Sequence, residues 1–152
     1  MNIRENGFQE GEETSRKKKS ENKNSPEEGL VRILWAPWRK SYVEKGVETR
    51  DCVLCQKSKE SEDRKNLILY RGQLCFILLN LFPYNNGHLM IAPYRHLERL
   101  VSLSNQEVLE MIELAQKSER VLGKALSAEG FNLGMNLGKV AGAGIADHIH
   151  LH

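Results

Sequence analysis

The stretch "DHIHLH", Asp147 to His152, places a histidine at every second position and an aliphatic residue between them. Side chains in a β-strand point alternately to the two faces of a sheet, so this spacing predicts a strand with three imidazoles on one face. The aliphatic residues on the other face would pack into a core. A fortuitous polar face or a tag remnant is the simpler alternative, but a tag would not alternate with core residues.

Composition indicates a soluble single-domain protein. The chain has 152 residues, of which 40% are hydrophobic and 28% charged, and its formal net charge is +2. This length suits one domain, and no apolar run has the length of a membrane helix. The near-neutral charge gives no indication of nucleic-acid binding, and the N-terminus does not have the pattern of a secretory signal. Three cysteines do not make a disulfide framework, so we expect a reduced, cytoplasmic protein with no membrane or nucleic-acid partner.

The chain divides into a polar tail and a domain. Residues 1–29 are nearly all polar and include "SRKKKSENKNSPEEG", which cannot bury enough apolar surface to offset its ordering entropy. We therefore expect residues 1–29 to form a disordered charged tail and residues 30–152 to form the domain. Trp35 and Trp38 stand near its start, and core packing is the simplest role for them.

Short apolar runs and one long amphipathic segment indicate an α+β fold. Ser104 and Glu107 have the spacing of a helix capping box, and apolar residues at helical spacing continue toward Ser127–Gly130. "NLFPYNNG" (80–87) reads as a turn, and "DCVLCQKSKESEDRKNL" (51–67) as a metal knuckle followed by a polar loop. Strands are expected at "LILY" (67–70), "QLCFILLN" (73–80), "HLMIAP" (88–93), "FNLGMNL" (131–137) and "HIHLH" (148–152). This order, with little βαβ alternation, favours an antiparallel sheet with one long helix.

A glycine-rich loop precedes the histidines. "GKVAGAG" (138–144) places glycines at 138, 142 and 144, where backbone N–H groups could converge on an anion. Such a loop alone is usually only flexible, but beside three histidines it suggests a phosphate site. A neutral imidazole is a capable nucleophile toward phosphorus, and an imidazolium can protonate a leaving oxygen.

Two cysteines could bind a metal. Cys52-x-x-Cys55 has the spacing of zinc ligands, and His96 and His148 are the best candidates to complete four ligands. A redox role would require a thioredoxin-like context that the sequence does not contain. The simplest division gives His148 to the metal and leaves His150 and His152 for chemistry.

These motifs resemble the histidine triad family. "HIHLH" is similar to its His-φ-His-φ-His motif, "LNLFPYNNGHLMIAPYRH" (79–96) to its upstream hairpin, and "LWAPWRKSYV" (34–43) to a bacterial and archaeal branch that contains diadenosine tetraphosphate phosphorylases. The resemblance extends from about Leu30 to His152. It implies an α+β fold with a strongly bent antiparallel sheet, one long helix, and a homodimer that shares an extended sheet.

The resemblance also implies roles for the triad and the metal ligands. His150 would attack the α-phosphate and form a nucleotidyl–histidine intermediate, and His152 would contact the phosphate. His148 would orient its neighbours or bind a structural zinc ion. The zinc ligands would be Cys52, Cys55, His96 and His148. No organic cofactor is implied.

Five further positions match nucleotide-binding positions of the family. Asn80 would hold the ribose hydroxyls, and His88 would flank the same pocket. Asn136 would contact the phosphate, and the Gly144–Ile145 backbone would donate hydrogen bonds to it.

Two departures from the family pattern concern activity. Several hydrolytic branches have a polar residue, often Gln, where this chain has Gly144, which argues against a simple hydrolase. The family also continues past the third histidine with two apolar residues and, in this branch, usually Pro-Arg-Trp and a tail. The C-terminal carboxylate on His152 would disfavour anion binding, so we expect weak or no activity from this chain as it stands, unless it is a shortened form of a longer natural protein.

The expected function is a nucleotidyl transferase or hydrolase that cleaves dinucleoside polyphosphates such as diadenosine tetraphosphate. Inorganic phosphate is favoured over water as the acceptor. An aminoacyl- or sulfo-nucleotide hydrolase of the same family and a zinc-stabilised nucleotide-binding module without turnover are the alternatives.

Overall fold

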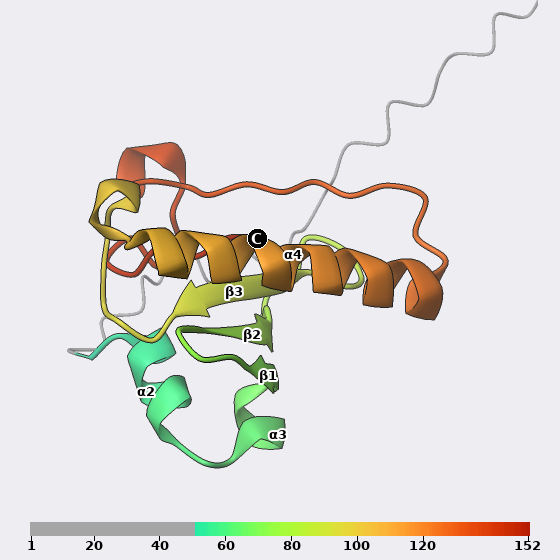
Figure 1. Cartoon of the computed structure of the whole chain (residues 1–152), viewed down its shortest axis with the longest axis horizontal. Coiled ribbons are helices and arrows are strands. Elements are labelled where there is room, and N and C mark those ends of the chain that lie inside the picture. The colour runs from blue at the N-terminus through green and yellow to red at the C-terminus, as the bar shows by residue number, and fades with distance from the viewer. Residues whose placement is uncertain (1–50) are drawn as a thin grey trace, which may run out of the picture. The chain divides into compact units, whose positions relative to one another are not determined.

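A three-stranded antiparallel sheet lies at the centre of the domain (Figure 1). Its strands are β1 (Ile68–Arg71), β2 (Cys75–Leu79) and β3 (Leu89–Pro93), in the order β1-β2-β3. They confirm the three strands predicted in this region, and residues 80–87 form the connection expected between β2 and β3. The computed structural model describes residues 51–152. The predicted tail (1–29), the start of the predicted domain and both tryptophans lie outside the described residues.

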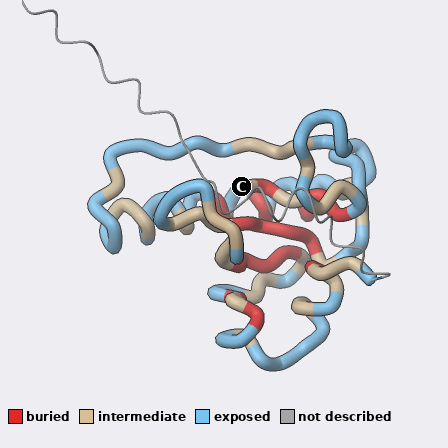
Figure 2. Tube along the Cα trace, turned by 180° about the vertical axis from the view of Figure 1, so that it is seen from behind, coloured by how far each residue is buried: buried red, intermediate tan, exposed pale blue. Residues whose placement is uncertain are grey.

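Helices cover both faces of the sheet. Cys75 and Ile77 of β2 point to one face and pack with the long helix α4 (Asn105–Leu126). Phe76 and Leu78 point to the other face and pack with Leu54 of a short helix. Because both faces of β2 are covered, this strand is apolar throughout, and the buried region follows β2 and β3 (Figure 2). The domain is therefore an α+β fold, as predicted.

The long helix begins at the predicted capping box. The Ser104 side chain accepts a hydrogen bond from the Glu107 N–H at 3.2 Å, and Glu107 accepts one from the Ser104 N–H at 2.7 Å. Arg95 donates two more bonds to the buried Glu107 carboxylate, at 2.7 and 2.6 Å. Met111 and Leu114 then form part of the stripe that packs on the sheet. The helix ends at Leu126, close to the predicted end.

A second carboxylate joins α4 to the β1–β2 turn. Glu110 accepts hydrogen bonds from the backbone N–H groups of Gln73 and Leu74, both at 2.6 Å. A Cβ atom on Gly72 would lie 2.1 Å from Glu110 Oε1 and 2.8 Å from the Cys75 carbonyl oxygen, so only glycine fits there. The turn is therefore fixed to the helix as well as to the sheet.

Two short helices occupy the segment predicted as a metal knuckle and polar loop. They are α2 (Val53–Lys59) and α3 (Asp63–Asn66), so the polar loop predicted after the metal knuckle is wrong where these helices form. Arg71 at the end of β1 explains their position, because it donates to Asp63, to the Ser58 carbonyl and to the Glu60 carbonyl. Tertiary contacts of this kind determine whether short helices form, because such helices are barely stable on their own.

The last two predicted strands form only isolated pairings. Gly134 exchanges backbone hydrogen bonds with His152, both at 2.9 Å, and Leu151 forms one antiparallel bridge with Ile91. Continued pairing would place Ile149 opposite Pro93, which has no N–H to donate. The Ile149 N–H donates instead to the Leu97 carbonyl, so the ladder stops after one bridge. The predicted alternation is still present, because Ile149 and Leu151 are buried.

None of the helices in the described part of the chain combines the length and the apolar character that a membrane crossing requires.

Glu107 gives a test of the helix start. Arg95 and the Ser104 cap lower the pKa of Glu107 from 4.5 to about 2, so its stabilising contribution is complete above about pH 4.5 and is lost as the pH falls toward 2. We expect Glu107→Gln to lower the free energy of unfolding at pH 7 by about 1–3 kcal/mol. Urea unfolding at pH 7 and at pH 3 should show a smaller difference between variant and parent at the lower pH. Exposed Glu113→Gln on the same helix is the control, and equal effects of the two substitutions would contradict the assignment.

Candidate metal centre and active site

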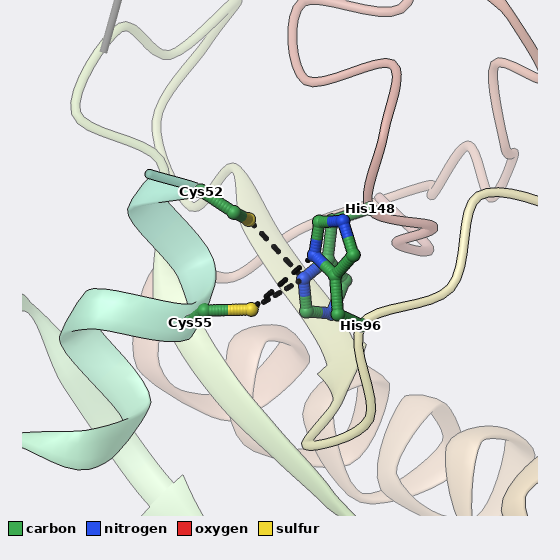
Figure 3. Close-up of side chains that lie close together, drawn as sticks. All are labelled: Cys52, Cys55, His96 and His148. Carbon is green, nitrogen blue, oxygen red and sulfur yellow. Dashed lines mark hydrogen bonds between the residues drawn. The ribbon is translucent and has the colours of Figure 1, made fainter. Parts of the chain in front are cut away.

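Four predicted metal ligands lie together between α2 and the loops that follow β3 (Figure 3). Cys52 is the N-cap of α2 and Cys55 lies in its first turn. His96 follows β3, and His148 comes from the histidine-rich segment. One ligand atom from each residue lies within 4.8 Å of all the others. The structure thus brings together residues that are up to 96 positions apart in the sequence.

Both imidazoles face the thiols through Nδ1. His148 Nδ1 lies 3.3 Å from Cys52 Sγ and 3.4 Å from Cys55 Sγ. His96 Nδ1 lies 3.3 Å from Cys55 Sγ. His148 Nε2 donates to the Pro93 carbonyl at 3.0 Å, and His96 Nε2 lies 3.8 Å from an Asp147 carboxylate oxygen. The hydrogen bond to Pro93 holds the proton of His148 on Nε2, so its Nδ1 keeps a lone pair for a metal.

The donor set fits a tetrahedral metal ion. With Zn–S near 2.3 Å and Zn–N near 2.0 Å, sulfur and nitrogen ligands at a tetrahedral angle should lie about 3.5 Å apart, close to the observed separations. Burial, followed by the hydrogen bond and charge of Cys52, raises the pKa of the Cys55 thiol to about 11 in the absence of a cation. A bound divalent ion would reverse this effect and hold both sulfurs as thiolates. The four residues can therefore hold a metal ion.

The triad divides between two environments. His148 is fully buried and faces the thiols, whereas His150 and His152 line a cavity of about 170 Å³. His150 Nδ1 donates to the His148 carbonyl at 2.9 Å, which leaves the Nε2 lone pair available. Burial lowers the pKa of His150, although this hydrogen bond opposes the change. A neutral imidazole with a free Nε2 has the form of a nucleophile.

The five predicted nucleotide-binding residues all line this same cavity, together with the two histidines; they are Asn80, His88, Asn136, Gly144 and Ile145. Asn80 accepts a hydrogen bond from the Phe82 N–H at 2.8 Å, and its Nδ2 lies 3.4 Å from His88 Nε2. The Tyr84 N–H donates to His88 Nδ1 at 3.0 Å, and the two rings stack. The turn between β2 and β3 therefore holds Asn80 and His88 in position.

The glycine-rich loop contributes backbone donors to the cavity. Gly138 and Gly142 have φ values of 85° and 83°, which favour glycine. The N–H groups of Ala141, Gly142 and Ala143 bond within the loop, but those of Gly144 and Ile145 form no hydrogen bond with the described residues. Both residues line the cavity beside His150. The loop can therefore present free N–H donors to an anion placed next to the imidazole.

Lys57 and Tyr84 also line the cavity, and the sequence analysis did not identify them. Lys57 lies four residues after Val53, which lines the cavity from the same helix. That spacing would have placed them on one face if α2 had been recognised as a helix.

Comparison with known proteins identifies the family. The HIT domain model matches residues 61–152. The chain belongs to the HIT family. The matched range contains the sheet, α4, the glycine-rich loop and all three triad histidines, so the predicted family is confirmed.

Similar proteins and structures agree with this membership. An AP-4-A phosphorylase of Mycobacterium tuberculosis is 36% identical over 126 residues, which are 78% of this HIT chain and 65% of that protein. A bis(5'-nucleosyl)-tetraphosphatase (asymmetrical) of Schizosaccharomyces pombe is 32% identical over 85 residues, 56% of this chain and 46% of that protein. The chain thus spans less than two thirds of either relative. A zinc-bound histidine triad protein from Mycobacterium smegmatis superposes with a TM-score of 0.57 at 26% identity, covering 67% of this chain and 72% of that one.

Proposed function

We propose that this HIT domain is a nucleotidyl transferase that cleaves dinucleoside polyphosphates through His150. The observation that carries the proposal is the placement of His150 in a cavity that Gly144 and Ile145 also line, where the backbone N–H groups of these two residues form no hydrogen bond with the described part of the chain. Similarity to the phosphorylase and the tetraphosphatase supports the substrate class. The similarity to the AP-4-A phosphorylase favours diadenosine tetraphosphate as the substrate.

The proposed reaction has two displacement steps. His150 Nε2 attacks the α-phosphorus, the bond from phosphorus to the bridging oxygen breaks, and a nucleoside polyphosphate leaves with the bonding electrons. His152, which also lines the cavity, contacts the phosphate and can supply a proton to the leaving oxygen. The loop N–H groups stabilise charge on the non-bridging oxygens. An acceptor then attacks the same phosphorus and releases the imidazole.

Phosphate is the acceptor that we favour. The similarity to a phosphorylase supports it, and Gly144 offers no side chain that could position a water molecule. Phosphate would convert diadenosine tetraphosphate into ADP and ATP, whereas water would give AMP and ATP. The similarity to a tetraphosphatase keeps hydrolysis as the second candidate.

We further propose that the metal is a structural zinc ion. Two thiolates and two imidazoles leave no open coordination position, which is typical of structural rather than catalytic zinc. The zinc-bound relative from Mycobacterium smegmatis supports this identity. When bound, zinc would join α2 to the segment that contains His148, and it would take no part in the phosphoryl chemistry.

The proposal includes a homodimer in the cytoplasm. Leu109, Ile112 and Val121 on α4 are 60%, 46% and 56% exposed, and contact with a second copy would bury them.

One incubation tests the activity and the acceptor. Diadenosine tetraphosphate is incubated with the protein, with and without inorganic phosphate, and the products are separated by mass. We expect ADP and ATP to form only with phosphate, and we expect His150→Asn to lower turnover on the order of 10⁴-fold or more while AMP still binds. Unchanged turnover in His150→Asn would contradict the mechanism. AMP in place of ADP would leave the mechanism intact and identify water as the acceptor.

Metal analysis tests the zinc centre separately. Purified protein should contain about one zinc ion per chain, and Cys55→Ser should lose it and melt at a lower temperature. Cys75→Ala removes the thiol in the core, which is not a ligand, and should keep the metal. A parent protein without metal, whose melting temperature does not respond to a chelator, would overturn the assignment.

A further inference from the structure

Gly134 lies directly opposite His152. The backbone N–H of each residue donates to the carbonyl of the other at 2.9 Å. Residues that exchange both bonds in an antiparallel pair have their side chains on the same face. The next residue, Met135, packs with the core on the side of α4, so position 134 faces away from that core. A side chain at position 134 would therefore lie beside the His152 imidazole.

Position 134 has no room for a side chain while this imidazole stays where it is. A Cβ atom there would lie 3.1 Å from His152 Nε2 and 3.6 Å from its Cδ2. The first distance is shorter than ordinary van der Waals contact, so the ring would have to move by a few tenths of an ångström. The φ angle of Gly134 does not lie in the left-handed region, so the backbone conformation does not require glycine. The close approach of the ring is the feature that requires it.

Two other rings contact the same imidazole. The His88 ring lies at a centroid distance of 5.8 Å and the Tyr84 ring at 6.5 Å, and both are nearly perpendicular to the His152 ring. All three side chains line the cavity that contains His150, whereas Gly134 does not line it. The ring of His152 is therefore held by aromatic neighbours within the cavity, and Gly134 leaves the space that its Nε2 edge occupies.

We propose that Gly134 is a positioning residue for the reaction at His150, because it lets the His152 imidazole take the place from which it contacts the phosphate and protonates the leaving oxygen. This inference rests on the proposed nucleotide function. Proton transfer requires the donor to lie within hydrogen-bond reach of the acceptor, so a small displacement of the ring slows the reaction. Gly134 acts through His152 and does not itself contact the substrate.

A single added methyl group tests the inference. Gly134→Ala is compared with Gly130→Ala, a matched control in the same segment, where a Cβ atom would have no neighbour within 4 Å. Turnover of diadenosine tetraphosphate is measured in the presence of phosphate, and stability is measured by urea unfolding. We expect Gly134→Ala to lower kcat on the order of tenfold with little change in KM, and the control to keep the kcat of the parent. Both variants should keep the urea midpoint of the parent.

A double-mutant cycle shows whether the effect passes through the imidazole. His152→Asn shortens the side chain so that no atom remains where Nε2 lies. In this background Gly134→Ala should lower kcat by less than about twofold, because no ring is left to displace. An equal loss in both backgrounds would mean that Gly134 acts by another route, and it would overturn the inference.

The remaining outcomes are also decisive. Equal kcat values for Gly134→Ala and Gly130→Ala overturn the inference and leave the nucleotide function intact. A Gly134→Ala protein that does not fold also overturns it, because the glycine would then serve stability. A parent protein without turnover overturns both the inference and the proposed function. If His152→Asn is too slow to measure, the comparison of the two alanine variants decides alone.

Discussion

The hydrogen bond from the His148 imidazole to the Pro93 carbonyl is the constraint on which the site depends. It joins the end of β3 to the histidine-rich segment inside the core, where His148 is fully buried. It also directs Nδ1 toward the two thiols, because Nε2 holds the proton. The next histidine in the alternation, His150, is thereby directed into the cavity. One contact thus helps to set both the arrangement of the four candidate metal ligands and the position of His150 in the cavity.

Residues 148–152, which include and follow this contact, both pack in the core and face the candidate site. The aliphatic residues among them, Ile149 and Leu151, are buried, and Leu151 packs against the side of the sheet that α4 covers. The histidines face the metal group and the cavity. Because alternation in an extended chain is strict, a shift of one residue would exchange the two sets. The bridge to Ile91 and the paired bonds of Gly134 with His152 prevent such a shift.

Much of this arrangement could be predicted from the sequence, because its signals are local. The capping box at Ser104 and the apolar runs of β1, β2 and β3 depend on near neighbours, and the structure shows all of them. The residues predicted to bind the metal and the nucleotide do lie together, although their roles are still proposals. The histidine spacing indicated a strand, but the pairing depends on Pro93, which lies 55 positions before His148. Helix α2 was missed because contacts of Arg71 hold it, and Lys57 was missed with it.

Helix α2 carries two of the four candidate metal ligands, Cys52 at its N-cap and Cys55 in its first turn, and its residues Val53, Leu54 and Lys57 line the cavity. A divalent ion that holds this helix against His148 and a nucleotide that contacts Val53 and Leu54 therefore act on the same element. Thermodynamic reciprocity applies to any such pair of ligands. If this protein binds both, whatever factor the metal adds to nucleotide affinity the nucleotide must add to metal affinity, and the supply of either ligand would then set how firmly the protein retains the other.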